Sequence, residues 1–182
     1  MDRGLVDQAV ANFEKAIQMN PAVAENYVAL AAIEDSRGNW QRAEQLIQQA
    51  LQIHPDDPFA ASNLADLLLE HGGSADSALS YAQIARQGLP ESPVTADALG
   101  WAYCQKGAYS LAVNLLEEAV RKAPDEPNYR YHLGMTYMKV ADRAHATEHL
   151  QRALKLSPTF AHADEIKGSL SKLSLPLSSE RH

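Results

Sequence analysis

The stretch that decides the fold spans residues 96–124 and reads ADALGWAYCQKGAYSLAVNLLEEAVRKAP. Leu99 stands beside Gly100, and this pairing puts a large and a small side chain where a second helix can approach closely. Gly107 follows and suits the left-handed backbone that ends a helix, and Pro124 closes the second amphipathic segment because it lacks an amide hydrogen. The stretch therefore predicts two antiparallel helices joined by a short turn.

The same hairpin recurs along the chain. Five prolines mark its ends at intervals of 34, 35, 34 and 34 residues, and an alanine lies five residues before each proline. A second row of alanines lies seven residues earlier, and each first helix carries a leucine. A fixed period of this length indicates a solenoid of helical hairpins. The rows are Pro21, Pro55, Pro90, Pro124 and Pro158; Ala16, Ala50, Ala85, Ala119 and Ala153; Ala9, Ala43, Ala78, Ala112 and Ala146; and Leu30, Leu64, Leu99 and Leu133.

One unit departs from the others. The 35-residue interval contains an extra residue, which we place in the turn His71-Gly72-Gly73-Ser74, because a surface turn tolerates an insertion. Ala82 stands in this unit where all the others carry larger residues, and Ala61 stands where the first and fourth full repeats do. We therefore expect the thinnest part of the core there, and local opening to begin there.

The rows resemble the tetratricopeptide repeat family, whose hallmark is W-x-x-L-G-x-x-Y, then A-x-x-x-F, then a proline. The resemblance covers residues 4–158 and includes Leu99-Gly100-x-x-Tyr103 and Leu133-Gly134-x-x-Tyr137. It implies an all-α, right-handed superhelical solenoid that binds a protein or peptide partner, without a catalytic centre or cofactor. Residues 95–173 are also similar to the ends of bacterial repeat proteins associated with exopolysaccharide export and envelope protein sorting.

The repeat divides the chain into one domain and a tail. We expect the domain to span residues 1–175, with a half repeat at 4–21, four full repeats at 22–158 and a capping helix at 159–173. The tail, 176–182, is predicted to be disordered.

Composition and charge exclude several classes of protein. A chain of 182 residues with 46% hydrophobic and 21% charged residues is predicted to fold. The net charge of −7 repels phosphate backbones, so we expect no nucleic-acid partner. The most leucine-rich stretch, residues 64–69, is interrupted by Asp66 and is far shorter than the roughly 20 apolar residues of a membrane span. We therefore expect no membrane insertion, and the single Cys104 excludes an internal disulfide.

The concave face of the solenoid, lined by the first helix of each hairpin, is the predicted binding groove. Trp101 and Tyr131 are the expected aromatic anchors, since large aromatic side chains often dominate binding. Trp101 could instead pack on Tyr131 and Met135, and Asp66 and Asp97 could meet a basic partner segment or stay solvated. The predicted groove residues are Phe59, Asn63, Asp66, Asp97, Trp101, Tyr131, His132 and Met135, with Val28, Ala32, Ser62 and Ala98 in the same rows.

The first predicted helix lacks a partner helix before it. Its apolar residues Leu5, Val6, Phe13 and Ile17 are therefore expected to form an exposed edge. Two interpretations stay open: the chain is a fragment of a longer array, or a second copy covers the edge in a homodimer. The chain begins without a basic segment and apolar block, so we expect no signal peptide and a soluble protein of the cytoplasm or periplasm.

One catalytic motif occurs, since residues 145–149 fit H-x-x-E-H with His145, Glu148 and His149. A zinc peptidase of that class needs a further acidic ligand well downstream, and only 33 residues follow His149. Ala146 and Leu150 of the same helix belong to the core rows. We therefore expect neither a metal site nor catalysis.

Overall fold

A computed structural model describes residues 3–175, which form α-helices and no strand. The helices are α1 (Arg3–Met19), α2 (Ala24–Ser36), α3 (Trp40–Ile53), α4 (Pro58–Glu70), α5 (Ala75–Gly88), α6 (Pro93–Gln105), α7 (Tyr109–Lys122), α8 (Pro127–Lys139), α9 (Arg143–Leu156) and α10 (Ala163–Ser174).

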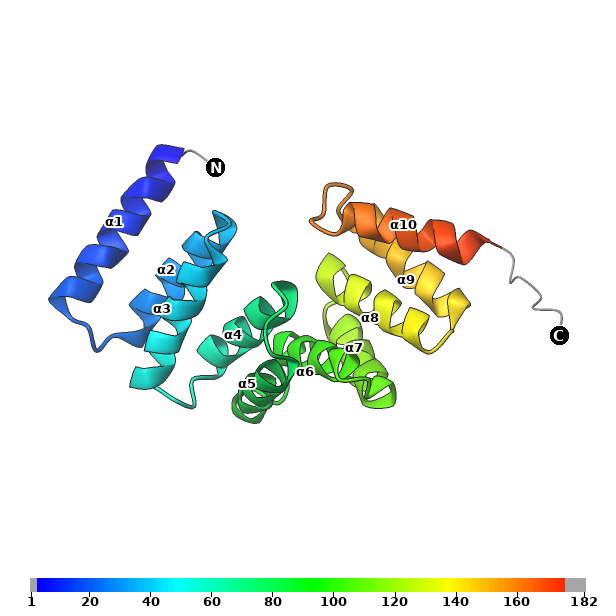
Figure 1. Ribbon diagram of the computed structural model, residues 1–182, viewed down its shortest axis with the longest axis horizontal. Coiled ribbons are helices and arrows are strands. Elements are labelled where there is room, and N and C mark those ends of the chain that lie inside the picture. Colours follow the sequence, from blue (N-terminus) through cyan, green and yellow to red (C-terminus); the bar gives the residue numbers. More distant parts are fainter. Residues whose placement is uncertain (1–2, 176–182) are drawn as a thin grey trace.

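Four antiparallel hairpins follow one another along an arch (Figure 1). We number them 1 to 4, for α2–α3, α4–α5, α6–α7 and α8–α9. Helix α1 lies before hairpin 1, helix α10 follows hairpin 4, and the two ends of the arch face each other across an opening. The predicted all-α solenoid of helical hairpins is confirmed.

The turns inside the hairpins follow the predicted backbone pattern. Three of them contain three residues, and the turn of hairpin 2 contains four, residues 71–74, which confirms the position of the extra residue. Gly38, Gly72 and Gly107 have φ of 79°, 73° and 78°. Ala141 takes the same conformation in hairpin 4, with φ of 59°, although it is unfavourable by roughly 1–2 kcal/mol for a residue with a Cβ atom.

The two helices of a hairpin meet through a small residue on the first helix and a larger one on the second. A Cβ atom added at Gly100 would lie 2.8 Å from Leu116 Cγ, and one at Gly134 would lie 2.8 Å from Leu150 Cγ. Hairpin 2 differs, because it sets Ala65 of α4 and Ala82 of α5 in a buried cluster that α6 completes with Ala98, Leu99 and Ala102. This alanine-rich cluster agrees with the prediction of a thin core in hairpin 2.

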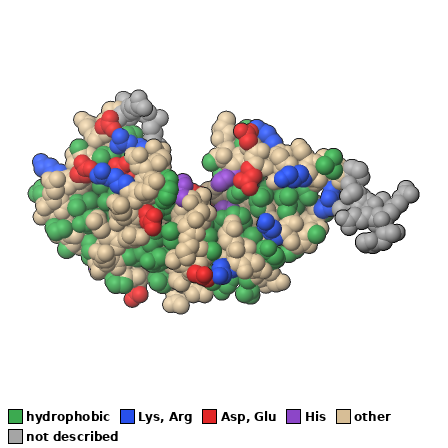
Figure 2. Space-filling model, viewed as in Figure 1, with side chains coloured by type: hydrophobic (Ala, Val, Ile, Leu, Met, Phe, Trp, Pro, Cys, Tyr) green, Lys and Arg blue, Asp and Glu red, His purple; other side chains and the backbone are tan. Residues whose placement is uncertain are grey.

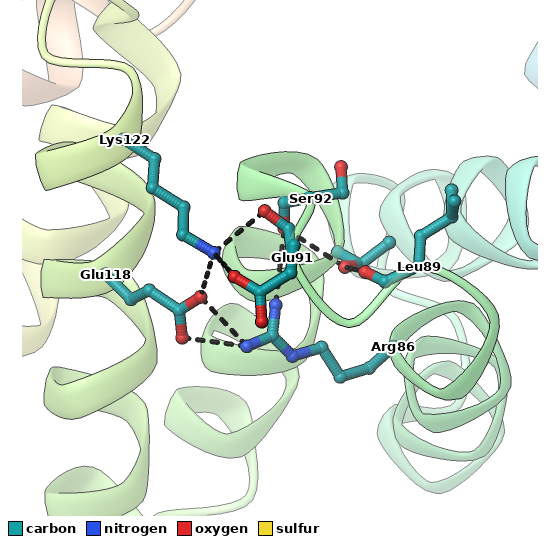
Figure 3. A network of polar contacts seen from close by, with 7 residues as sticks. Arg86, Leu89, Glu91, Ser92, Glu118 and Lys122 are labelled. Atoms are coloured by element: carbon teal, nitrogen blue, oxygen red, sulfur yellow. Dashed lines mark hydrogen bonds and ion pairs between the residues drawn. The ribbon is translucent and has the colours of Figure 1, made fainter.

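Successive hairpins are joined on the outer side by polar contacts as well as by apolar ones (Figure 3). Arg86 of α5 donates to both carboxylate oxygens of Glu118 on α7, at 2.9 and 2.8 Å. Lys122 lies 2.7 Å from Glu118 and 2.8 Å from Glu91 in the loop before α6. Burial acts to raise the pKa of Glu118, but the hydrogen bonds from Lys122 and Arg86 outweigh it and lower that pKa.

The prediction that α1 presents an exposed apolar edge is wrong for Phe13 and Ile17. Phe13 and Ile17 pack, together with Val10, against the buried cluster of hairpin 1, because α1 lies directly on α2. Leu5 remains 66% exposed, and Val6 is partly buried. The unpartnered apolar surface of α1 is therefore smaller than the sequence pattern predicted.

The last helix begins at Ala163, four residues later than the predicted start of the capping helix at 159. Two tight turns precede it, since Phe160 N donates to Ser157 O and Ala163 N donates to Phe160 O. Ala163 and Ile166 of this helix are buried, and Ile166 is fully so. Arg143 caps the carbonyl end of α10 at Leu173 and Leu175. The predicted disordered tail, 176–182, lies outside the described residues.

Candidate functional site

The first helices of the hairpins, α2, α4, α6 and α8, line the hollow of the arch. Figure 2 shows this hollow as a notch between the two ends of the molecule, with histidine side chains at its base. On α4, four residues recur at helical spacing and therefore form one stripe along the helix: Phe59, Asn63, Asp66 and Glu70. This stripe faces the groove. Phe59 is 64% exposed, and Asn63 and Glu70 are exposed as well.

Two rows of the predicted groove residues differ in exposure, and only one of the two is open. Asp66, Trp101 and Met135 occupy equivalent positions and are partly exposed. Ser62, Asp97 and Tyr131 form the neighbouring row and are buried.

The second row is buried because α4 contacts α6, and α6 contacts α8, on the inner side of the curve. The prediction that Tyr131 faces solvent is also wrong, since it is only 4% exposed and lies against Phe160 and His162 before α10. Asp97 and His132 are likewise buried beneath the groove surface.

Aromatic rings form a row from α6 across α8 to the loop before α10. Trp101 stacks on His132, with ring centroids 4.5 Å apart and planes inclined by 12°. Tyr131 stacks on His162 at 4.3 Å, and its hydroxyl donates to Glu165 Oε2 at 2.8 Å. Tyr131 therefore ties α8 to α10, while Trp101 both packs on its neighbours and presents a partly open ring to the groove.

The groove contains two adjoining pockets. The α2–α4 pocket has a volume of about 230 Å³, and the α4–α8 pocket one of about 220 Å³. Asp66 and Glu70 line both, so the two pockets form one continuous path across the first helices. The α4–α8 pocket is also lined by Val94, Asp97, Trp101, Glu126, Asn128, Tyr129 and His132.

The α4–α8 pocket is strongly acidic. Asp66, Glu70, Asp97 and Glu126 line it, and no lysine or arginine does. Burial and the nearby carboxylates of Asp97 and Glu70 raise the pKa of Asp66 well above its ordinary value. Because the folded-state pKa is raised, ionising Asp66 destabilises the fold as the pH rises above its ordinary pKa.

Asp97 is the most constrained of these carboxylates. Its Oδ2 accepts a hydrogen bond from His132 Nδ1 at 2.9 Å. Its Oδ1 is buried without a hydrogen-bond partner among the described residues. Leaving a buried acceptor unpaired costs about 1–3 kcal/mol, and more when the group is charged. The pocket lining therefore includes a carboxylate with one oxygen paired and one oxygen unpaired.

The H-x-x-E-H motif forms no metal site among residues 3–175, where no group of three candidate ligands comes together. His145 Nδ1 donates to Asp142 Oδ2 at 2.7 Å on the exposed face of α9. His149 Nδ1 accepts a hydrogen bond from Arg130 at 3.2 Å, and burial together with that cation lowers the pKa of His149. The two imidazoles thus have separate partners.

Five residues that line the α4–α8 pocket were absent from the predicted groove: Glu70, Val94, Glu126, Asn128 and Tyr129. Extending the helical stripe of Phe59, Asn63 and Asp66 by one turn finds Glu70. Glu126 and Tyr129 have no comparable signal, because they reach the pocket through the packing of α8 on α6.

Three family descriptions match parts of the chain: a tetratricopeptide repeat at residues 1–67, a TPR repeat at 100–140 and a tetratricopeptide repeat at 127–160. The chain therefore carries tetratricopeptide repeats and folds as a tetratricopeptide-repeat solenoid. In residues 3–175, no helix combines the length and hydrophobicity needed to cross a membrane.

Individual relatives share the repeat at low identity. The BBSome complex member BBS4 of Bos taurus is 24% identical over 156 residues, 86% of this chain and 30% of that protein. The cellulose synthase 2 operon protein C of Komagataeibacter xylinus is 27% identical over 177 residues, 88% of this chain and 14% of that protein. The chain thus spans less than a third of the length of either relative.

The fold is also shared with a solved structure, that of YrrB, described as a TPR protein with an unusual peptide-binding site. The TM-score is 0.65 at 19% identity, covering 91% of this chain and 84% of that one. At this identity the likeness concerns the fold alone.

Proposed function

We propose that this chain is a non-catalytic interaction scaffold that holds a peptide segment or helix of a partner protein in its concave groove. The observation that carries the proposal is the continuous pair of pockets across α2, α4, α6 and α8, joined at Asp66 and Glu70. Phe59, Asn63 and Trp101 flank this path with apolar and polar groups, which is the mixture that peptide-binding surfaces use.

We further propose that the chain works inside a larger protein assembly. BBS4 is named as a member of a complex, and the Komagataeibacter protein is named for a cellulose synthase operon. Both relatives are much longer than this chain, so the repeat forms one part of each. The second likeness supports the prediction of a relationship to exopolysaccharide export systems.

The test blocks the groove without changing its charge. Asn63 is exposed on α4 and lines the α2–α4 pocket, and Gln83 is exposed on α5, the second helix of the same hairpin. An Asn63→Trp variant fills the path, whereas Gln83→Trp adds the same ring outside it.

Affinity capture from cells of the source organism, followed by mass spectrometry, compares both variants with the wild type after circular dichroism has confirmed folding. We expect a partner that the wild type and Gln83→Trp retain and Asn63→Trp loses. Equal capture by all three proteins contradicts groove binding. Tyr131 is unsuitable for this test, because truncating its buried ring would disturb the packing of α10.

A second candidate function is self-association through α1. Leu5 and Met19 are 66% and 76% exposed, so this helix still presents apolar side chains. Under this alternative, the mass in sedimentation experiments rises with protein concentration, and Leu5→Ser abolishes the rise. A constant monomer mass for the wild type at high concentration excludes it.

A further inference from the structure

We propose that the α4–α8 pocket binds the guanidinium group of an arginine side chain presented by the partner segment. The inference rests on the proposed groove function and specifies the chemistry of its ligand. Four steps support it: the charge of the pocket, the buried carboxylate of Asp97, the size and aromatic lining of the pocket, and the spacing of its acidic groups.

The pocket presents more negative charge than the described residues around it neutralise. Asp66 and Glu70 form no ion pair with a described lysine or arginine, whereas Glu118 on the outer side contacts Arg86 and Lys122. Both groove residues lie in the last turns of α4, where the helix dipole adds partial negative charge. The net charge of −7 attracts a cationic partner over a longer range.

Asp97 supplies a second, independent observation. It is only 5% exposed, lines the pocket, and leaves Oδ1 without a hydrogen-bond donor among the described residues. A guanidinium brings five N–H donors in a planar arrangement, so it can satisfy several carboxylate oxygens at once. An ammonium group brings three donors from a single point, which suits this arrangement less well.

The size and lining of the pocket also suit a side chain. Its volume of about 220 Å³ far exceeds the roughly 10–15 Å³ that one water molecule needs. Trp101 and Tyr129 line it, and aromatic faces attract cations, arginine in particular. The His132 ring supports the indole from one side, so Trp101 is held in place before a ligand enters.

The spacing of the acidic groups argues against a metal ion in this pocket. No three histidine, cysteine, aspartate or glutamate side chains in the described part of the chain come close enough to hold one. A planar cation several atoms wide can bridge carboxylates at such separations, whereas a single ion cannot.

The first test measures binding of three fluorescein-labelled peptides, hexa-arginine, hexalysine and hexacitrulline, by fluorescence anisotropy at low salt. Citrulline keeps the shape of arginine without its charge. The matched variants are Glu70→Gln in the groove and Glu148→Gln on the exposed face of α9, which remove the same charge from exposed sites. Asp66→Asn/Glu70→Gln removes two groove carboxyl groups with little change in shape.

We expect hexa-arginine to bind the wild type about fivefold more tightly than hexalysine, and hexacitrulline not to bind. Glu70→Gln should weaken hexa-arginine about threefold and the double variant at least tenfold, while Glu148→Gln changes affinity less than twofold. Equal weakening by Glu70→Gln and Glu148→Gln overturns the proposal, because the attraction is then a property of the whole acidic surface. Tighter binding of hexalysine than of hexa-arginine also overturns it.

The second test separates this inference from the proposed function. Affinity capture is repeated with Asp66→Asn/Glu70→Gln beside Asn63→Trp. If both variants lose the partner, both proposals stand. If Asn63→Trp loses the partner and the charge variant keeps it, the groove binds a partner but the arginine site is wrong. If neither loses it, the groove function itself fails.

Discussion

Hairpins 2 and 4 fill the same space between their helices in different ways. Hairpin 4 sets Gly134 against Leu150, and a Cβ atom on that glycine would lie 2.8 Å from the leucine side chain. Hairpin 2 has Ala65 and Ala82 at the equivalent positions, both fully buried. A small residue on one helix is thus matched to the size of its partner on the other. The difference teaches that the repeat conserves the fit of a pair of residues rather than either residue alone.

The comparison extends to the groove. Hairpin 2 contributes Asp66 and Glu70 to the α4–α8 pocket, and hairpin 4 contributes Tyr129 and His132. The alanine-rich hairpin therefore provides charge, and the leucine- and aromatic-rich end provides the rigid side of the site. Changes at the paired core positions of the two hairpins test this comparison through the stability of the fold.

The largest expected effect comes from making hairpin 4 resemble hairpin 2. Leu150→Ala should reduce the free energy of unfolding by about 2–5 kcal/mol, because Leu150 is fully buried and its loss leaves a cavity. Urea melts followed by circular dichroism measure the change. The control Leu111→Ala removes a leucine that is 52% exposed and should cost much less. If both variants reduce the free energy of unfolding equally, the assignment of Leu150 to the buried core is contradicted.

Making hairpin 2 resemble hairpin 4 should also reduce the free energy of unfolding, by about 1–3 kcal/mol. Ala82→Leu adds three carbon atoms to a closely packed interface where Leu79 and Tyr81 already surround the alanines. Adding Ala65→Gly should recover part of the loss, because the pair then matches that of hairpin 4. The same urea melts decide the outcome, and a double variant less stable than Ala82→Leu alone argues against paired fitting.

A third change isolates the close approach in hairpin 4. Gly134→Ala gains helix propensity of about 1 kcal/mol but places its Cβ atom against Leu150, including its backbone nitrogen at 3.2 Å. We expect a net loss of about 1 kcal/mol, since overpacking costs about 1–3 kcal/mol. In the Leu150→Ala background the same substitution should become neutral or stabilising, and a double-mutant cycle measures this coupling. Strict additivity would show that the two residues do not compete for space.

The smallest expected effect concerns the turn of hairpin 4. Ala141→Gly should stabilise the protein by about 0.5–1 kcal/mol, because φ of 59° is strained for alanine and glycine relieves that strain at some entropic cost. Thermal melts should show a higher midpoint. The opposite change, Gly107→Ala, should lower the midpoint. The φ of 78° is strained for alanine, and no atom lies near enough to the added Cβ to offset that strain by packing. A lower midpoint for Ala141→Gly would contradict this account.

Much of the fold could be predicted because its rules are local. The spacing of prolines and alanines indicated the hairpins, and the extra residue of hairpin 2 was placed in the turn that contains it. Ala141 takes the left-handed conformation at the position where the other turns have a glycine. The start of α10 was predicted four residues early, because the two turns at residues 157–163 have no signal comparable to the repeat.

The sequence by itself determined the period, the helices and the paired core positions, since all of these depend on residues within one hairpin. Only the tertiary structure decided which groove residues are open. Asp97 and His132 are buried because α4, α6 and α8 press together on the inside of the curve. Tyr131 is buried because Phe160, His162 and Glu165, about one repeat further along the chain, lie against it. For the same reason Glu126 and Tyr129 join Asp66 and Glu70 in one pocket. The curvature that brings them together arises from packing between hairpins, and no local spacing in the chain encodes it.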